Sequence, residues 1–529
     1  MKKYFILILI AICFTGAKAQ DYNTPVNKLR IAEFAISNLY VDKVDENKLV
    51  EEAIVKMLST LDPHSIYSDP QEVKSLNEPL QGNFDGIGVQ FNMVDDTLLV
   101  IQPVAGGPSQ KVGIQAGDRI VMVNDTSIAG VKMKTEAIMG RLRGPKGTKV
   151  YLKILRRGEK ELLDFTVTRD RIPISSIDAA YMIDNQTGYV SISRFAATTH
   201  EEFLKDLLDL KAKGMNNLII DLEDNGGGYL NAAVDMANEF LEKGNEIVHT
   251  QGRTQPRSDM HADGRGNFRT GKLIVLINEF SASASEILTG AIQDWDRGVV
   301  VGRRSFGKGL VQRPIDLPDG SMIRLTVARY YTPSGRCIQK PYENIEKYNE
   351  DLIDRYNRGE MTNADNIHFP DSLKRYTLRL HRVVYGGGGI MPDYFVPIDT
   401  STYSNYYRKI VNKGLIFNYT IKYTESHKAS ILSTYKTFDN FEKSFNISDE
   451  DVKAIENEAT KAGIQYDEKQ MNTSMPLLRT QFKALVARDI WGMNEYYKVI
   501  NTQNENVKKA LQILSDGSYE IKLKFHNGK

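Results

Sequence analysis

Apolar residues recur along the first part of the chain at the spacing of an α-helix. Between residues 20 and 80 they fall every three or four positions, as at Leu29, Ala32 and Ile36. Such a period places apolar side chains on one face of a helix. We therefore expect a helical N-terminal region that is broken by a turn at Leu61–Ser65. His64, within that turn, is interpreted as a structural residue and not as a catalytic base.

Residues 81–172 have a different pattern, in which short apolar runs are separated by glycine-containing turns. The runs are Gly88–Met93, Leu98–Ile101, Arg119–Val123, Lys149–Leu155 and Leu162–Thr168. Short runs of this kind, bounded by turn residues, predict strands. With one helix expected at Lys134–Arg141, this segment has the length and the strand spacing of a small β-rich binding domain.

Residues 173–398 are predicted to form an α/β core with parallel strands, because apolar strands alternate with helices there. The strands are expected at Leu218–Asp221, Leu273–Ile277 and Val299–Gly302, and the helices at Tyr229–Leu241 and Ser283–Asp294. Within this core, residues 341–374 are a polar insertion and residues 385–389 a flexible break. Residues 399–529 are charged and predicted to be mostly helical.

The first nineteen residues have the pattern of a secretory signal peptide. Lys2 and Lys3 precede the apolar stretch Phe5–Phe14, and Ala17-Lys18-Ala19 is a small-x-small cleavage site. A membrane anchor is the alternative, but a spanning helix needs about 20 apolar residues. The sequence therefore predicts an exported protein, periplasmic or attached to the envelope.

Composition narrows the partners and the cofactors. The chain has 529 residues, of which 41% are hydrophobic, and a net charge of +1. This balance does not suggest long-range attraction to nucleic acid or to an anionic membrane. Its two cysteines are Cys13 and Cys337, and its eight histidines show no HExxH spacing. We expect no metal and no organic cofactor.

The segment Asn278–Glu286 places serines where a strand gives way to a helix. A side chain at such a junction is exposed, and the first amides of the helix are free donors with a partial positive charge. Those donors suit an oxyanion. Taken alone, however, the serines of this segment could simply cap the helix.

A lysine at the edge of another predicted strand favours the catalytic interpretation of the serines over simple helix capping. Lys308 lies between two glycines, and glycine allows the backbone to turn sharply. A lysine serves as the base for a serine hydroxyl when its pKa falls from about 10.4 toward 7, which costs about 4 kcal/mol. Burial supplies such a shift. Gln312 could orient the amine without adding a charge.

A glycine loop follows the strand that ends at Asp221. Residues 221–228 read Asp-Leu-Glu-Asp-Asn-Gly-Gly-Gly, which fits neither nucleotide-binding fingerprint. A plain turn is the simple interpretation. An oxyanion loop is the functional one, because a glycine amide can approach a substrate carbonyl closely.

These segments together resemble the carboxyl-terminal processing peptidases, also called tail-specific proteases. The resemblance spans about residues 27–400 and is carried most specifically by residues 281–287 and 302–312. It implies that Ser283 is the nucleophile, that Lys308 is its base and that Gln312 supports the lysine. It also implies a core that resembles the ClpP/crotonase α/β fold, with helical N- and C-terminal regions around it.

The same resemblance implies the oxyanion donors, which are the amide of Ala284 and one amide from residues 226–228, here assigned to Gly227. One position departs from the family pattern. The loop usually begins Asp-Leu-Arg, whereas this chain has Glu223 in place of the arginine. The departure puts the local charge network in question and leaves the serine and lysine in place.

Residues 81–172 resemble a PDZ domain. The stretch Gly86, Ile87, Gly88 and Val89 resembles its carboxylate-binding loop, and Gly117–Ile120 is its other recurring signature. Consecutive backbone amides form a nest for a terminal carboxylate, and the adjacent strand edge pairs with the peptide. In relatives this domain also gates the active site, and Arg143 is the residue we assign to that signal.

The resulting hypothesis is an exported serine endopeptidase that holds the C-terminal ends of protein substrates and cuts peptide bonds through an acyl-enzyme. The alternatives are a catalytically inert PDZ-type adaptor and a Ser/Lys amidase or esterase that acts on small molecules. The expected partners are proteins or peptides with free C-termini. The family also allows an adaptor protein and a homo-oligomer.

Overall fold

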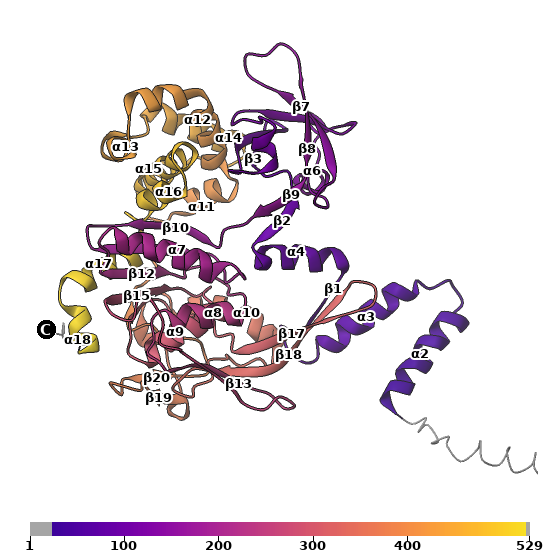
Figure 1. Ribbon diagram of the computed structural model, residues 1–529, viewed down its shortest axis with the longest axis vertical. Coiled ribbons are helices and arrows are strands. Elements are labelled where there is room, and N and C mark those ends of the chain that lie inside the picture. The colour runs from indigo at the N-terminus through magenta and orange to yellow at the C-terminus, as the bar shows by residue number, and fades with distance from the viewer. Residues whose placement is uncertain (1–23, 525–529) are drawn as a thin grey trace, which may run out of the picture. The chain divides into compact units, whose positions relative to one another are not determined.

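The computed structural model describes residues 24–524, and the predicted signal peptide lies outside this range (Figure 1). The chain separates into two compact units. One contains the residues up to Pro70 together with Arg313–Leu325, and the other contains Gln71–Gln312 and the chain from Thr326 onward.

The first unit is helical, with one short strand before Pro70. Helices α2 (Pro25–Leu39) and α3 (Glu46–Leu58) precede strand β1 (Ile66–Ser68). The predicted turn before β1 is present, because the amides of His64 and Ser65 both donate to Asp62 Oδ1. Strand β1 pairs antiparallel with residues 322–324, although its own region was predicted from the sequence to be helical.

In the second unit, the β-rich domain predicted at residues 81–172 is observed. Its sheet has the order β3-β4-β5-β7-β8, with β6 beside β5. The strands are β3 (Val89–Val94), β4 (Thr97–Pro103), β5 (Arg119–Val123), β6 (Thr126–Ser127), β7 (Lys149–Leu155) and β8 (Leu163–Thr168), with helices α5 (Pro108–Lys111) and α6 (Thr135–Leu142). Helix α4 (Pro70–Gln81) precedes the domain. Strands β2 (Asn83–Gly86) and β9 (Asp170–Pro173), which begin and end the domain, pair with each other.

The α/β core is built on a six-stranded sheet in the order β10-β11-β12-β15-β16-β21. The strands are β10 (Ile177–Met182), β11 (Thr187–Ile192), β12 (Asn217–Asp221), β15 (Lys272–Ile277), β16 (Val299–Gly302) and β21 (Tyr394–Phe395). All neighbouring pairs from β11 to β21 are parallel, and β10 is antiparallel to β11. The predicted α/β class with parallel strands is confirmed.

Both faces of this sheet are covered by helices. Helices α7 (Thr199–Ala212), α8 (Leu230–Asn238) and α9 (Ala284–Asp294) pack on one face, in the largest apolar cluster of the described residues. Helices α17 (Glu505–Ser515) and α18 (Ser518–Leu523), from the far end of the chain, cover the other face. The sheet interior is therefore completed by the last residues of the C-terminal region.

A second set of strands adjoins the core. Hairpin strands β13 (Glu246–Gln251) and β14 (Ser258–His261) pair antiparallel, and β13 also pairs with residues 329–331 of β18 (Met322–Tyr331). Strand β17 (Leu310–Asp316) pairs with β18. None of these four strands was predicted from the sequence.

The polar insertion is an ordered substructure. It contains helix α10 (Ile345–Asn357) and the short helices η1 (Ala364–Asn366) and η2 (Asp371–Leu373), followed by strands β19 (Lys374–Tyr376) and β20 (Val383–Tyr385). The flexible break expected at residues 385–389 is wrong. The amides of Gly387 and Gly389 donate to the carbonyls of Cys337 and Ile338, which hold this stretch in place.

The C-terminal region is helical, as predicted, and has an aromatic-rich core of its own. Its helices before α17 are α11 (Asn405–Asn412), α12 (Leu415–Thr434), α13 (Phe438–Ser444), α14 (Asp449–Lys461), α15 (Glu468–Ile490) and α16 (Met493–Ile500). Within residues 24–524, none of the helices has the length and apolar character needed to cross a bilayer.

Candidate active site

Three loops meet at the carboxyl end of the parallel sheet. Strands β12, β15 and β16 are neighbours, and their last residues Asp221, Ile277 and Gly302 lie at the same edge. The glycine loop, the serine segment and the lysine loop follow these three strands directly. Parallel pairing therefore brings together three motifs that are far apart in the sequence.

Ser283 occupies the sharp turn between β15 and α9. Its backbone has φ 56° and ψ −112°, a conformation that costs a residue other than glycine about 1–3 kcal/mol. Its neighbours Ala282 and Ala284 are buried, whereas Ser283 is partly exposed. The turn thus presents one serine side chain at the start of a helix. Capping alone does not require such a strained backbone.

The Glu286 carboxylate joins the serine turn to the lysine loop. Its Oε2 accepts the amide of Ser283 at 2.8 Å and the amide of Lys308 at 2.9 Å. Its Oε1 accepts the amide of Gly307 at 2.7 Å and the hydroxyl of Ser305 at 2.5 Å. Because one oxygen binds both backbones, Ser283 and Lys308 are held at a fixed separation.

Burial raises the pKa of Glu286 to about 7, although the hydrogen bonds from Ser305, Lys308, Ser283 and Gly307 oppose that rise. The side chain is 1% exposed. Its protonation state near neutral pH therefore affects how firmly the two loops are joined.

Tyr330 of β18 makes a second link between the same loops. Its hydroxyl lies 3.1 Å from the carbonyl oxygen of Ser283 and 2.8 Å from that of Lys308. Burial, followed by the nearby Glu286, raises the pKa of Tyr330 well above its usual value, so the phenol remains a donor.

The glycine loop contacts the serine turn closely at Gly227. A Cβ atom at this position would lie 2.8 Å from Ser283 Cβ and 2.9 Å from the amide nitrogen of Ala284. The φ of Gly227 is +100°, so both space and conformation require glycine. In the structure its amide donates to Asn225 Oδ1 at 2.8 Å, while the Asn225 carbonyl accepts from Ala282 and Ser285.

Gln312 is the third residue of β17 and is partly buried. Its Nε2 donates to Thr326 Oγ1 across to β18 at 3.3 Å. This contact fixes the direction of the amide group.

Glu223, which replaces the family's arginine, is bound by the C-terminal region. It accepts from the side-chain amides of Asn504 and Asn506, at 2.9 and 2.5 Å. Burial raises its pKa, and burial together with Glu223 raises the pKa of the neighbouring Asp221 well above the usual range. The altered charge network is therefore accommodated by two asparagines just before and within α17.

The predicted carboxylate-binding loop of the PDZ domain has a fixed shape. Ser109 donates both its amide and its hydroxyl to the carbonyl of Ile87, at 3.0 and 2.7 Å. Gly88 has φ +72°, and a Cβ there would lie 2.9 Å from Ile172 Cδ1. Strand β3, which begins at Val89, is an edge strand of its sheet, so its outer side can pair with an added strand.

Arg143 follows helix α6 and contacts one residue before the PDZ domain and one near the start of it. Its guanidinium bonds Glu78 of α4 at 2.7 Å and lies 4.7 Å from the centre of the Phe84 ring. The residue assigned to a gating signal is thus tied to the segment that leads into the PDZ domain.

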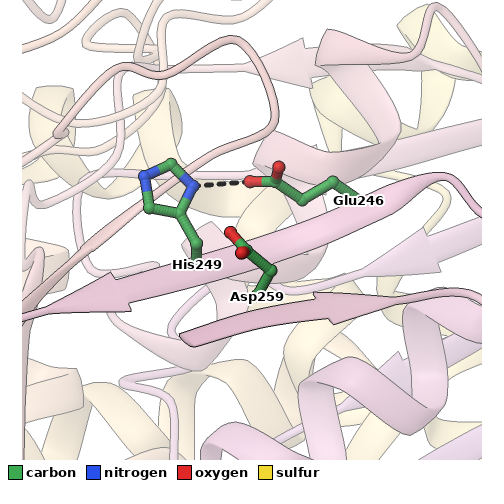
Figure 2. A group of neighbouring side chains, drawn as sticks. All are labelled: Glu246, His249 and Asp259. Carbon is green, nitrogen blue, oxygen red and sulfur yellow. Dashed lines mark hydrogen bonds and ion pairs between the residues drawn. The ribbon is translucent and has the colours of Figure 1, made fainter. Parts of the chain in front are cut away.

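A histidine and two carboxylates lie together on the β13–β14 hairpin, apart from the loops described above. Figure 2 shows Glu246, His249 and Asp259, whose candidate ligand atoms all lie within 4.8 Å of one another. Arg257 already donates to both carboxylates, at 3.2 and 2.5 Å. We interpret the group as an ion-pair cluster.

Sequence reasoning missed two residues that organise the site. Glu286 entered only as part of a motif, although its position three residues after Ser283 has the spacing of a capping box. Tyr330 gave no signal, because its strand was not predicted.

The fold and these loops define a serine peptidase that carries a PDZ domain. Residues 186–346 match Peptidase family S41, and residues 86–167 match a PDZ domain. Residues 14–72 match the N-terminal domain of the activating protease CtpB, and residues 406–492 match a family of unknown function. The chain belongs to the carboxy-terminal processing protease family.

Two curated relatives and one solved structure illustrate the similarity. Carboxy-terminal processing protease CtpB of Bacillus subtilis is 36% identical over 62% of this chain and 69% of its own length. The carboxy-terminal-processing protease of Bartonella bacilliformis is 39% identical over 57% of this chain and 69% of its own length. The photosystem II D1 C-terminal processing protease has 29% identity, covers 60% of this chain and 85% of its own, and has a TM-score of 0.35.

Proposed function

We propose that this protein is an exported serine endopeptidase that recognises the C-terminal ends of protein substrates and cuts them through a Ser283 acyl-enzyme. The observation that carries the proposal is the Glu286 carboxylate, which binds the amides of Ser283 and Lys308 through one oxygen atom. A serine in a strained, partly exposed turn is thereby fixed beside a lysine loop.

In the proposed reaction, neutral Lys308 takes the proton from Ser283 Oγ as that oxygen attacks the scissile carbonyl. Protonated Lys308 then gives the proton to the leaving amine, and water hydrolyses the acyl-enzyme in a second step. Gln312 supports the lysine without adding a negative charge, which would keep the amine protonated.

The oxyanion is proposed to bind the amides of Ala284 and Gly227. Ala284 is the first residue of α9, where helix amides have no intrahelical acceptor. The Gly227 amide lies against the serine turn, and the substrate oxygen would displace the Asn225 side chain from it. Each such donor is worth about 3 kcal/mol of transition-state stabilisation.

The PDZ domain is proposed to hold the substrate tail. The loop Gly86, Ile87, Gly88 and Val89 would bind the terminal carboxylate, and the free edge of β3 would pair with the substrate residues that precede it.

Export is proposed from the signal-peptide pattern at residues 1–19. An adaptor protein remains a proposed partner, and co-purification from envelope extracts tests it. Self-association, supported by the exposed Phe34 and Leu39 of α2, is tested by sedimentation of the mature chain.

Paired substitutions test the catalytic assignment. Ser283→Ala and Lys308→Met are each expected to abolish cleavage of an unstructured protein substrate, because one removes the nucleophile and the other its base. A fluorophosphonate probe should label the wild-type protein and the Gly227→Ala variant to different extents, and should not label Ser283→Ala. Cleavage by Ser283→Ala at the wild-type rate would leave the inert adaptor as the better hypothesis.

The matched control is Ser285→Ala. Ser285 is a buried serine in the same segment, and its hydroxyl donates to the Asn225 carbonyl at 2.9 Å. This variant should lose stability while it retains probe labelling. Labelling that disappears from Ser285→Ala and persists in Ser283→Ala would reassign the nucleophile.

A further inference from the structure

The polar insertion contacts the loop that carries Lys308. Arg355 of α10 donates from Nη1 to the carbonyl of Ser305 at 3.2 Å and from Nη2 to the carbonyl of Arg304 at 2.5 Å. These two carbonyls lie just before Phe306-Gly307-Lys308 in the chain. Arg355 is 2% exposed, so the contact is internal.

The next residue of the loop, Phe306, contacts the insertion both directly and through Lys340, which lies just before the insertion. The Phe306 ring packs edge to face against Tyr348 of α10, with the ring centres 6.0 Å apart. Lys340 Nζ lies 4.0 Å from the centre of the Phe306 ring and 4.2 Å from that of Tyr348 on α10. Its ammonium group is oriented by Asp351, also on α10, at 2.9 Å. A cation over aromatic faces is favourable, and more so when it is partly desolvated.

A buried carboxylate completes the contact. Glu360, which follows α10, binds Arg304 at 2.6 Å and lies 3.7 Å from Arg355. Arg304 also donates to the carbonyl of Gly388, in the glycine-rich stretch near the end of the core. Burial, followed by the charge of Arg304, lowers the pKa of Arg355 to about 10, so the guanidinium remains charged at neutral pH.

The lysine loop is thus held by two independent sets of contacts. Glu286 binds its residues 305, 307 and 308 from the side of the serine turn. The insertion binds the carbonyls of residues 304 and 305 through Arg355 and contacts the ring of Phe306 through Tyr348. One set binds two amides and a hydroxyl and the other binds two carbonyls and a ring, which leaves the loop little freedom to rotate.

We infer that the insertion is a positioning element for Lys308, and that Arg355 is its principal residue. The inference rests on the proposed role of Lys308 as the base. Arg355 acts through the backbone of the lysine loop and touches no reacting atom. Because proton transfer requires the amine within hydrogen-bonding reach of the hydroxyl, a displaced loop slows the chemical step and leaves substrate binding unchanged.

Arg355→Gln tests the inference. It removes the paired donors to the carbonyls of Arg304 and Ser305, and kcat should fall by up to about 100-fold, the cost of a displacement near 1 Å. KM and the affinity of the PDZ domain for a C-terminal peptide should change less than about twofold. Arg355→Lys keeps the charge and can reach one carbonyl, so its kcat should lie between those of the wild-type protein and Arg355→Gln. The dependence of probe labelling on pH should also shift in Arg355→Gln.

Arg358→Gln is the matched control. Arg358 also binds Glu360, at 2.8 Å, but it is largely exposed and lies outside the contacts to the lysine loop described above. The Arg358→Gln variant should cleave the protein substrate at the wild-type rate. A loss of melting temperature in Arg355→Gln with unchanged kcat and pH profile would overturn the inference, because it would show a purely structural role.

Asp351→Asn keeps the test decisive if Arg355→Gln does not fold. It removes the negative charge beside Lys340 but keeps an oxygen acceptor there, as well as the Tyr348 carbonyl, and kcat should fall several-fold with KM unchanged. An Asp351→Asn enzyme with wild-type kcat would overturn the inference. If the wild-type protein itself neither cleaves nor labels, the proposed function fails instead, so the two failures are distinguishable.

Discussion

At the scale of single residues, the site depends on one buried carboxylate. Glu286 has a pKa of about 7, and only its ionised form can accept from all four of its donors. Activity should therefore rise as pH increases through about 7. The stability contribution has the opposite sign. Because the folded-state pKa lies above that of the unfolded chain, this group lowers the free energy of unfolding as pH rises from about 4.3 to about 7.

Glu286→Gln should remove this pH dependence. The glutamine oxygen can replace only one of the two carboxylate oxygens, so its NH₂ group faces either the amides of Ser283 and Lys308 or the amide of Gly307, and the junction of the two loops is weakened. We expect kcat to fall by about 100-fold at pH 8, measured by cleavage and probe labelling. Unfolding in urea at pH 5 and pH 8 provides the control. If the loss of activity at low pH persists unchanged in Glu286→Gln, that loss must be caused by the titration of another group.

The sequence pointed to individual residues of the candidate site more directly than to their arrangement in space. Lys308 stood out because a lysine between two glycines is unusual for a solvated charge, whereas the roles of Ser283 and Gln312 were implied by the family resemblance and stay predictions. The strained backbone at Ser283 and the hydrogen bond between Asn225 and Gly227 could not be predicted from the sequence. Both arise from how separate loops pack, and local periodicity carries no record of such packing.

At the scale of elements, the C-terminal helices are part of the catalytic core. Residues such as Val507, Ile513 and Tyr519 pack on the same face of the sheet as Tyr189 and Ile274. Lys272 of β15 also bonds the carbonyl of Leu514 at 3.0 Å. The sequence predicted helices here but gave no indication of what they cover, because an apolar helix face does not specify its partner.

Ile513→Ala should therefore destabilise the protease core by about 2–5 kcal/mol, the usual cost of removing a fully buried aliphatic side chain. Ile513 is 0% exposed. The measurement is urea unfolding followed by the fluorescence of Trp295, in a variant with Trp491 replaced by Phe. Gln512→Ala, at the exposed neighbouring position, should be nearly neutral. Equal stability of the two variants would mean that α17 does not contribute to the core.

Elements with strong local patterns were predicted well, and those built by distant pairing were not. Strands β5, β7 and β16 have the predicted bounds, because each is a compact run of β-branched and apolar residues. Strands β1 and β9 have only three and four residues, and they form because partners far away in the chain complete their hydrogen bonds. Pairing of that kind leaves little trace in a single sequence.

At the scale of the whole molecule, the PDZ domain should make the enzyme sensitive to the substrate's terminal charge. A protein substrate whose C-terminal carboxylate is amidated should be cut with a kcat/KM at least about 10-fold lower. The loss should appear mainly in KM, because amidation removes a charge-assisted set of backbone hydrogen bonds. Short peptides that occupy the active site alone should be cut equally in both forms.

Gly88→Val should abolish the discrimination, since its side chain would collide with Ile172. Gly106→Ala is the control. Gly106 also has a positive φ, of +70°, but a Cβ added there would have no atom within 4 Å, so the carboxylate loop is undisturbed. Discrimination that survives Gly88→Val would place tail recognition outside this loop.

The packing of α17 and α18 on the sheet has a consequence for how the enzyme is made. Translation reaches Ser283 and Lys308 roughly 200 residues before it reaches the helices that close the other side of their sheet. During synthesis one apolar face of that sheet has no cover, and the core cannot reach its final packing. A chain that lacks residues 505–523 should therefore expose one apolar face of the sheet and leave the protease core incompletely packed.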